Sequence, residues 1–276
     1  MKVLAPAAVA SEAAGIGPSQ CLLDKVSRHG VGRCGVKLNV DQSRRKFAVV
    51  LLGPPGAGKG TQAKVIAAHC RVPHISSGDL LRDHVARGTK LGIQAKSVMA
   101  RGELVPDDLV YDMVVWRLRQ RDAEQGFILD GFPRTAAQAG WLDAFLEHEF
   151  FDNAHASKGL PVVVEIQVDY NNLLRRLTGR RTCPAGHIYN IYLQPPRVDE
   201  VCDVDGLTLV IRNDDREQVI RERLAAYERE TKPLADYYWA TERLFMVNGD
   251  LPVPEVTAQI AKVIEAHCAV AMNSKL

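Results

Sequence analysis

The 276-residue sequence has few cysteines, no long apolar run and almost no excess of charge of one sign. No apolar run approaches the ~20 residues that a membrane-spanning helix needs, which argues against a spanning protein. Six scattered cysteines are too few for a disulfide framework and fit a reducing compartment. The net charge of +2 argues against binding nucleic acid by bulk charge. The 46% apolar and 25% charged residues are typical of a globular protein with one or two domains.

Acidic residues are scarce in the first 46 positions, which carry eight Lys or Arg but three Asp or Glu. This N-terminal extension has no apolar core of a secretory signal, and no aromatic residue precedes Phe47. Its composition partly fits a mitochondrial transit peptide and equally fits a flexible tail. The expectation is a cytoplasmic protein, with the mitochondrion as the alternative if residues 1–46 act as a transit peptide. Basic residues without interleaved aromatics do not favour nucleic-acid binding.

Strand signals alternate with helical stretches over the rest of the chain. Continuous apolar runs predict buried strands at residues 47–52, 126–130, 162–168 and 244–247. Helical composition predicts helices at residues 59–70, 79–87, 90–101, 107–122, 135–148, 170–178, 214–239 and 253–270. This alternation is typical of an α/β fold whose parallel sheet is covered on both faces. Residues 180–212 break the rhythm with short alternating segments and predict a small antiparallel insertion.

A glycine-rich loop joins the first predicted strand to the first predicted helix. Its sequence is Gly53-Pro54-Pro55-Gly56-Ala57-Gly58-Lys59-Gly60-Thr61, in the context that a P-loop requires. Glycines let backbone N–H groups converge on phosphate, and Lys59 adds a positive charge. Gly60 stands where a Mg²⁺-binding Ser or Thr usually follows the lysine, and Thr61 comes one place later. The metal therefore depends more on phosphates, waters and a distant carboxylate, for which Asp130 is the candidate.

Together with this loop, five later motifs resemble the nucleoside monophosphate kinases, and most closely the long-lid adenylate kinases. These motifs are Ile75-Ser76-Ser77-Gly78-Asp79-Leu80-Leu81-Arg82, Gly102-Glu103-Leu104-Val105-Pro106-Asp107, Asp130-Gly131-Phe132-Pro133-Arg134-Thr135 with Gln138, Arg180-Arg181, and Arg212-Asn213-Asp214-Asp215 followed by Arg223. The resemblance covers residues 47–270 in the family's order. It implies a three-layer P-loop core with a parallel β-sheet, a helical AMP-binding insertion at 76–105 and a small antiparallel lid at 180–212.

The resemblance also implies an activity and a set of residues that support it. The reaction is the reversible transfer MgATP + AMP = 2 ADP, without a covalent enzyme intermediate. The implied catalytic residues are Lys59, Arg134, Arg180, Arg212 and Arg223. The implied ATP-binding residues are Gly56, Ala57, Gly58, Lys59, Gly60, Thr61, Arg176, Arg180, Ile188 and Tyr189. The implied AMP-binding residues are Ser77, Arg82, Glu103, Val105, Gly131, Arg134, Gln138, Arg212 and Arg223. Asp130 and Asp79 would lie in the second shell of Mg²⁺.

Arginine suits these positions because phosphoryl transfer brings several negative charges together, and a guanidinium stays protonated while it binds two oxygens. The implied partners are small nucleotides, with neither nucleic acid nor a membrane span, and the implied state is a monomer. Two alternatives stay open. Tyr189-Asn190-Ile191 is similar to the GTP:AMP phosphotransferase branch. The other alternative is a non-catalytic nucleotide-binding module. Such a module would be expected to have lost some of these arginines, whereas this sequence has all of them.

The predicted lid carries four residues near positions where some relatives bind structural zinc: Cys183, His187, Cys202 and Asp205. Cys202 and Asp205 have the spacing of half a site. In the other half Gly186 stands where a second cysteine is expected, and His187 is the available fourth ligand. Because a structural zinc needs four ligands, the irregular set favours a metal-free lid held by hydrogen bonds and packing.

Overall fold

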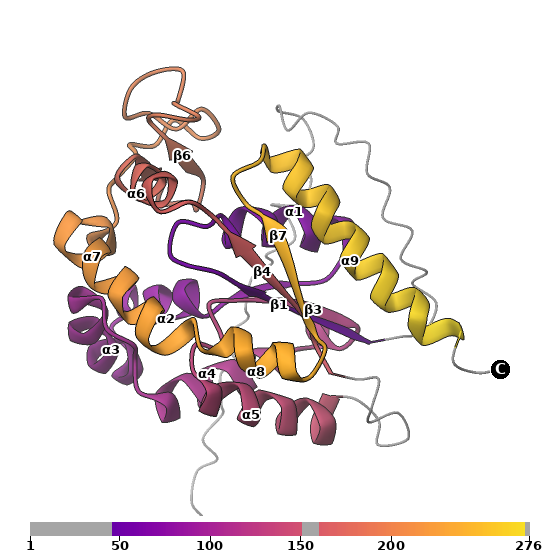
Figure 1. Cartoon of the computed structure of the whole chain (residues 1–276). Coiled ribbons are helices and arrows are strands. Elements are labelled where there is room, and N and C mark those ends of the chain that lie inside the picture. The colour runs from indigo at the N-terminus through magenta and orange to yellow at the C-terminus, as the bar shows by residue number, and fades with distance from the viewer. Residues whose placement is uncertain (1–45, 151–159, 274–276) are drawn as a thin grey trace, which may run out of the picture. The chain divides into compact units, whose positions relative to one another are not determined.

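The computed structural model describes residues 46–150 and 160–273, so nearly all of the 1–46 extension lies outside the described residues (Figure 1). A five-stranded parallel sheet forms the centre, with strand order β2-β3-β1-β4-β7. Its strands are β1 Phe47–Leu52, β2 His74–Ser76, β3 Gly126–Asp130, β4 Val162–Gln167 and β7 Leu244–Asn248. The predicted α/β fold with a parallel sheet is confirmed. Only β2 was missed, because three residues are too few to show a pattern.

Nine α-helices accompany the sheet within the described residues. They are α1 Lys59–Cys70, α2 Ser77–Ala86, α3 Lys90–Arg101, α4 Asp107–Leu118, α5 Ala136–Phe145, α6 Tyr170–Thr178, α7 Glu217–Ala226, α8 Leu234–Ala240 and α9 Val253–Asn273. The single helix predicted at 214–239 is wrong. It divides into a 3₁₀ turn at Asn213–Asp215, α7, a π-helical turn at Tyr227–Thr231 and α8, which begins after Pro233. Proline favours such a start because it lacks the N–H that a helix interior needs.

Alternate residues of β1 face two helical layers, which explains its continuous apolar sequence. Val49 and Leu51 pack with side chains of α1, α6, α7 and α9. Val50 and Leu52 pack on the opposite face with side chains of α2, α4, α5 and α8. In Figure 1, α1 and α9 accordingly lie on one side of the sheet and α4, α5 and α8 on the other. Within residues 46–150 and 160–273, no helix combines the length and apolarity needed to cross a membrane.

Helices α2 and α3 form a tight hairpin between β2 and α4. Thr89 caps α3, since its side-chain oxygen accepts from the Gly92 N–H at 3.1 Å, and it also contacts His84 Nδ1 at 2.9 Å. Gly92 allows the two helices to touch, because a Cβ there would lie 2.0 Å from the His84 carbonyl oxygen. The hairpin therefore depends on the absence of a side chain at one position.

The segment between α6 and α7 contains the predicted antiparallel sheet. Strands β5 Arg180–Thr182 and β6 Ile188–Asn190 pair antiparallel, and Thr182 bridges to Val210 near the end of the segment. The segment has a small core of its own, made of Cys183, Tyr189, Cys202 and Leu209. It touches α1 where Lys64 Nζ donates to the Gly186 carbonyl oxygen at 3.1 Å.

Replacing Gly92 with alanine tests the close approach of α2 and α3. We expect Gly92→Ala to lower the free energy of unfolding by about 1–3 kcal/mol, because the added methyl forces the helices apart. Gly140→Ala is the matched control: it lies within α5 with no atom within 4 Å of the added Cβ, and should be neutral or stabilise by about 0.5–1 kcal/mol. Urea unfolding of both variants measures the difference. Equal effects would show that the hairpin tolerates a side chain.

Candidate active site

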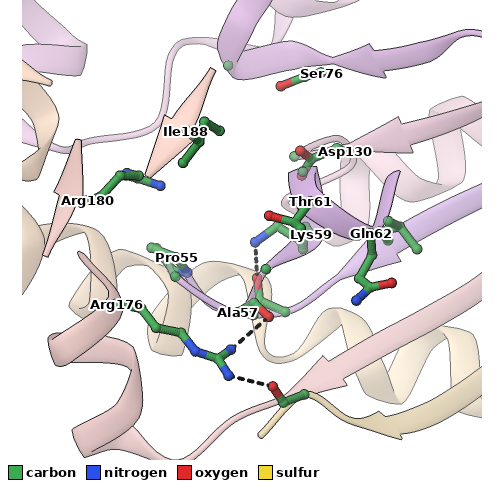
Figure 2. Close-up of a pocket in the computed structure, with 18 of the residues that line it drawn as sticks. Pro55, Ala57, Lys59, Thr61, Gln62, Ser76, Asp130, Arg176, Arg180 and Ile188 are labelled. Atoms are coloured by element: carbon green, nitrogen blue, oxygen red, sulfur yellow. Dashed lines mark hydrogen bonds between the residues drawn. The ribbon is translucent and has the colours of Figure 1, made fainter. Parts of the chain in front are cut away.

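A pocket of about 660 Å³ opens beyond the carboxyl ends of β1 and β3 (Figure 2). It is lined by the glycine-rich loop, by the start of α2 and by residues of the segment between α6 and α7, which contains β5 and β6 and is called the β5–β6 segment below. A smaller pocket adjoins it on the side of α2, α3 and α5 and shares part of its wall. The shared wall includes Arg82, Gly131, Arg134 and Arg223. We call these the large pocket and the small pocket, and together they form a two-lobed cleft.

The glycine-rich loop presents backbone N–H groups to the large pocket. Gly58, with φ of 97°, lies in the left-handed region and precedes α1, whose first turn has no side-chain cap. Gly53 is required for a different reason, because a Cβ there would lie 2.7 Å from the Ile166 carbonyl oxygen. An uncapped helix start with converging N–H groups is a site for phosphate or another anion.

Lys59 lines the large pocket and is half-buried. Its Nζ donates to the carbonyl oxygens of Gly53 at 2.7 Å and Pro54 at 2.9 Å. The pKa of Lys59 is lowered to about 8, mainly by burial and also by the charges of Arg134, Arg223 and Arg180, against the opposing effect of Asp130. In Figure 2, Lys59, Asp130 and Arg180 point toward the same space. A negative ligand there would favour the charged state of the lysine and raise its pKa.

Two consecutive aspartates organise three of the arginines. Asp215 is buried and accepts from Arg180, by its Nε at 2.6 Å and by its Nη2, and from Arg223 Nη1 at 3.2 Å. Asp214 Oδ2 lies 3.1 Å from Arg223 Nη1 and 3.6 Å from Arg82 Nη1. These carboxylates therefore bring together arginines from α2, β5 and α7. Sequence reasoning treated Asp214 and Asp215 only as the end of the lid motif, although two adjacent acids after an arginine were a usable signal.

Two other arginines have no carboxylate partner among residues 46–150 and 160–273. Arg134 Nε donates to the Gly131 carbonyl oxygen at 2.8 Å, and Arg212 Nε donates to Thr182 Oγ1 at 3.1 Å. Burial foremost, with neighbouring cations, lowers the pKa of each to about 10. Both therefore carry positive charge at neutral pH without a paired carboxylate among the described residues, although Asp130 and Asp214 act on Arg134, and Asp79 and Asp214 on Arg212, from a distance. The cleft is built to receive an anion.

The buried Gln138 side chain lines the small pocket and has a partner on each side of its amide. Gln138 Oε1 accepts the Arg134 backbone N–H at 2.7 Å, and its Nε2 donates to Asp107 Oδ1 at 2.6 Å. Ser77 Oγ donates to the Gly131 carbonyl oxygen at 2.6 Å, which holds the loop after β3 against α2. Sequence reasoning did not identify Asp107, whose role depends on α4 beginning beside α5.

Asp130 is the best-placed carboxylate for a divalent cation near the glycine-rich loop. Its Oδ2 lies 3.2 Å from the position that a Cβ of Gly60 would take and 3.5 Å from His74 Nε2. Burial alone would raise the pKa of Asp130, but His74 and the charge of Lys59 outweigh it and hold the pKa below its usual value. An ionised carboxylate beside a phosphate loop fits the oxygen ligands that Mg²⁺ prefers. Asp79 contacts Arg82 at 2.5 Å and lines the same pocket.

The structure brings the sequence-predicted nucleotide residues together around the cleft. The large pocket is lined by Gly56, Ala57, Gly58, Lys59, Gly60, Thr61, Asp79, Arg82, Asp130, Gly131, Arg134, Arg176, Arg180, Ile188, Tyr189, Arg212 and Arg223. The small pocket adds Ser77, Glu103, Val105 and Gln138. The Glu103 carboxylate is exposed and pairs with Arg101 at 2.7 Å. Arg176 is anchored by the carbonyl oxygens of Ala57 and Gly249 at 3.3 and 2.7 Å (Figure 2).

Four potential metal ligands converge in the β5–β6 segment. One donor atom each from Cys183, His187, Cys202 and Asp205 lies within 4.8 Å of all the others. Asp205 Oδ2 lies 3.0 Å from Cys183 Sγ and 3.1 Å from His187 Nδ1, which lies 3.4 Å from Cys202 Sγ. The four residues named from the sequence therefore lie together, and the turn at Gly186 places His187 beside Cys202 and Asp205.

Comparison with known proteins gives a consistent family. The family model described as "Adenylate kinase" matches residues 51–243. Three similar relatives carry the name adenylate kinase. The protein from Acidothermus cellulolyticus is 50% identical over 76% of this chain and 94% of its own length. Those from Methanocella arvoryzae and Clostridium novyi are 46% and 43% identical over 78% and 79% of this chain, and over 97% and 98% of their own lengths.

The lowered pKa of Lys59 predicts how the affinity for a triphosphate depends on pH. A bound triphosphate favours the protonated lysine, so binding above the pKa of about 8 must take up a proton. We expect the affinity for ATP to be nearly constant from pH 7 to 7.5 and then to fall, by up to tenfold per pH unit, toward pH 9.5. Titration calorimetry measures both the affinity and the proton uptake. In Lys59→Met this proton uptake should disappear, and its persistence would assign the titration to another group.

Proposed function

The chain belongs to the adenylate kinase family, and from that premise we propose that its two-lobed cleft transfers the γ-phosphoryl group of MgATP to AMP, reversibly forming two ADP. The observation that carries the proposal is the pair of arginines without a paired carboxylate, Arg134 and Arg212, in a cleft whose two lobes share a wall. The large pocket has the glycine-rich loop for a triphosphate. The small pocket adjoins it and would receive part of the second nucleotide, with Arg82 and Arg134 on the wall between them.

The donor nucleotide would lie on the glycine-rich loop. The backbone N–H groups at the start of α1 bind the phosphates, and Lys59 leaves its carbonyl partners to neutralise them. Arg176, fixed by Ala57 and Gly249, would lie against the donor base. Ile188 and Tyr189 would cover the nucleotide from the lid side. Mg²⁺, when bound, neutralises phosphate charge, and Asp130 with Asp79 would hold its water shell.

The acceptor nucleotide would lie in the small pocket. Arg82 and Arg134 bind its phosphate, while Gln138 reads the edge of the base and Gly131 leaves room for it. Ser77, Val105 and the backbone near Glu103 complete the wall. An AMP phosphate oxygen is then itself the nucleophile, so the reaction requires no strong general base and no covalent intermediate.

Catalysis would come from positioning and from stabilising charge on the transferred group. Arg180, Arg212 and Arg223 surround the space between the two nucleotides, and Asp214 and Asp215 hold two of them in place. Because these arginines are already desolvated, they need little reorganisation as charge moves from one nucleotide to the other. Closure of the lid would exclude water and so limit hydrolysis of ATP.

The names of the similar relatives do not favour the GTP:AMP phosphotransferase alternative. We also propose that the chain works as a monomer, as its resemblance to the adenylate kinases implies. A cytoplasmic location is likewise proposed, supported by the few, scattered cysteines of the sequence. The role of residues 1–46 stays a prediction.

A structural zinc in the lid is the second proposal, and the convergence of four donors favours it. Ligand distances of ~2.0–2.3 Å give a tetrahedron whose edges are ~3.3–3.8 Å, near the observed 3.0, 3.1 and 3.4 Å separations. Two thiols, one imidazole and one carboxylate are ligands that zinc accepts. Zinc held by Cys183, His187, Cys202 and Asp205 would crosslink the two halves of the lid. The metal would be structural, away from the reacting phosphates.

A phosphoryl-transfer panel tests the activity. With Mg²⁺, ATP and AMP the purified chain should form ADP, while GTP as donor and CMP, UMP or GMP as acceptor should react more slowly. Arg134→Ala should lower kcat/KM for AMP by about 10²–10³-fold, because an unpaired cation at the transferred group is lost. The exposed Arg216→Ala is the control and should keep full activity. Tight ATP binding without transfer to any acceptor would instead indicate a nucleotide-binding module.

Metal analysis tests the zinc site. We expect about one zinc per chain by mass spectrometry, and its loss in Cys183→Ser and Cys202→Ser together with a lower Tm, because metal binding contributes folding energy. Cys70→Ser, in α1, is the matched cysteine control and should retain the metal. Protein that binds no zinc when refolded with it would show that hydrogen bonds alone hold the lid.

A further inference from the structure

We propose that Asp107 is a positioning residue that makes the small pocket select a 6-aminopurine over a 6-oxopurine, by fixing the orientation of the Gln138 amide. The inference deepens the proposed function and rests on it, since it concerns the base of the acceptor nucleotide. Gln138 lines the small pocket, whereas Asp107 is not among the residues that line either pocket. Asp107 therefore acts through Gln138 and not on the nucleotide itself.

The orientation of the Gln138 amide is set by two groups of opposite character. The Arg134 backbone N–H can only donate, so it must face Oε1, which it meets at 2.7 Å. The Asp107 carboxylate oxygen accepts, so it faces Nε2, at 2.6 Å. Rotating the amide by half a turn would place Oε1 against a carboxylate oxygen and Nε2 against an N–H. Since Gln138 is only 2% exposed, water cannot relieve either contact.

The two contacts leave Gln138 with one N–H and one oxygen lone pair for a ligand. An adenine base offers an acceptor at N1 and a donor at its 6-amino group, which match this fixed donor and acceptor. Hypoxanthine and guanine offer the reverse, a donor at N1 and an acceptor at O6. An amide held in this orientation therefore forms two hydrogen bonds with adenine. Against a 6-oxopurine it would place donor against donor and acceptor against acceptor. An amide free to turn would accept both.

Asp107 is itself held in place. It is the first residue of α4, where the helix N-terminus favours a carboxylate. The Tyr111 hydroxyl donates to its second oxygen at 3.4 Å. Burial foremost, together with Asp107, raises the pKa of Tyr111, so the hydroxyl stays a donor. The Tyr111 ring stacks on Trp141 with centroids 4.2 Å apart, and Trp141 belongs to α5, the helix of Gln138. The contacts that fix the Gln138 amide therefore come from both α4 and α5.

The test compares AMP with IMP, which differ only in the groups at N1 and C6 of the base. Asp107→Asn keeps the shape but offers either an oxygen or an N–H to Gln138. It removes one of the two groups that hold the amide, so only the Arg134 N–H still opposes the turned orientation. We expect the ratio of kcat/KM for AMP to that for IMP, with ATP as donor, to fall at least about tenfold. Asp108→Asn makes the same charge change at the next, exposed residue of the same helical turn and should leave the ratio unchanged.

A double-variant cycle separates a positioning role from a structural one. In a Gln138→Leu background, Asp107→Asn should leave the remaining AMP:IMP ratio unchanged, because Asp107 acts through the missing amide. A structural role would lower both rates together and leave the ratio intact in every background, which would overturn the inference. Thermal unfolding by circular dichroism confirms that each variant is folded. A wild-type chain that fails to phosphorylate AMP would refute the proposed function itself, whereas an unchanged ratio in an active Asp107→Asn enzyme would refute only the role of Asp107.

Discussion

The crowding of desolvated positive charge is the constraint on which the rest of the cleft depends. Lys59, Arg134 and Arg212 all have lowered pKa values because burial removes the water that would stabilise them. Such a cluster survives in a folded protein only if carboxylates offset part of the charge. Asp214 and Asp215 do this for the paired arginines, while Arg134 and Arg212 keep their charge for the phosphates.

The parallel sheet determines where that charge can gather. Strands β1 and β3 end side by side, so the glycine-rich loop and Asp130 must lie together at one edge. The arginines reach this edge from α2, from the loop after β3, from α6, from the ends of the segment between α6 and α7, and from α7. The sheet thus fixes the phosphate loop and Asp130, while the surrounding helices and loops supply the positive charge.

Sequence patterns predicted the long, buried elements well and the short or interrupted ones poorly. Four strands were placed within one residue, since each is apolar on both faces. The three-residue β2 and the division of 214–239 at a π-helical turn were missed, because tertiary packing sets them. The nucleotide residues were found through contiguous motifs. Asp107 ends one of these motifs, but the motif assigned it no role. Its 2.6 Å contact with Gln138 is what indicates one.

The sequence by itself determined the order of elements, the phosphate loop and the identity of the charged side chains, because these depend on local patterns along the chain. Tertiary structure decided which of those charges meet. It pairs Asp215 with arginines of β5 and α7, gives Arg134 no paired carboxylate in the part of the chain that the structure describes, and assembles Cys183, His187, Cys202 and Asp205 despite irregular spacing. Contacts between residues far apart in sequence depend on how helices and strands pack, and no local pattern records that geometry.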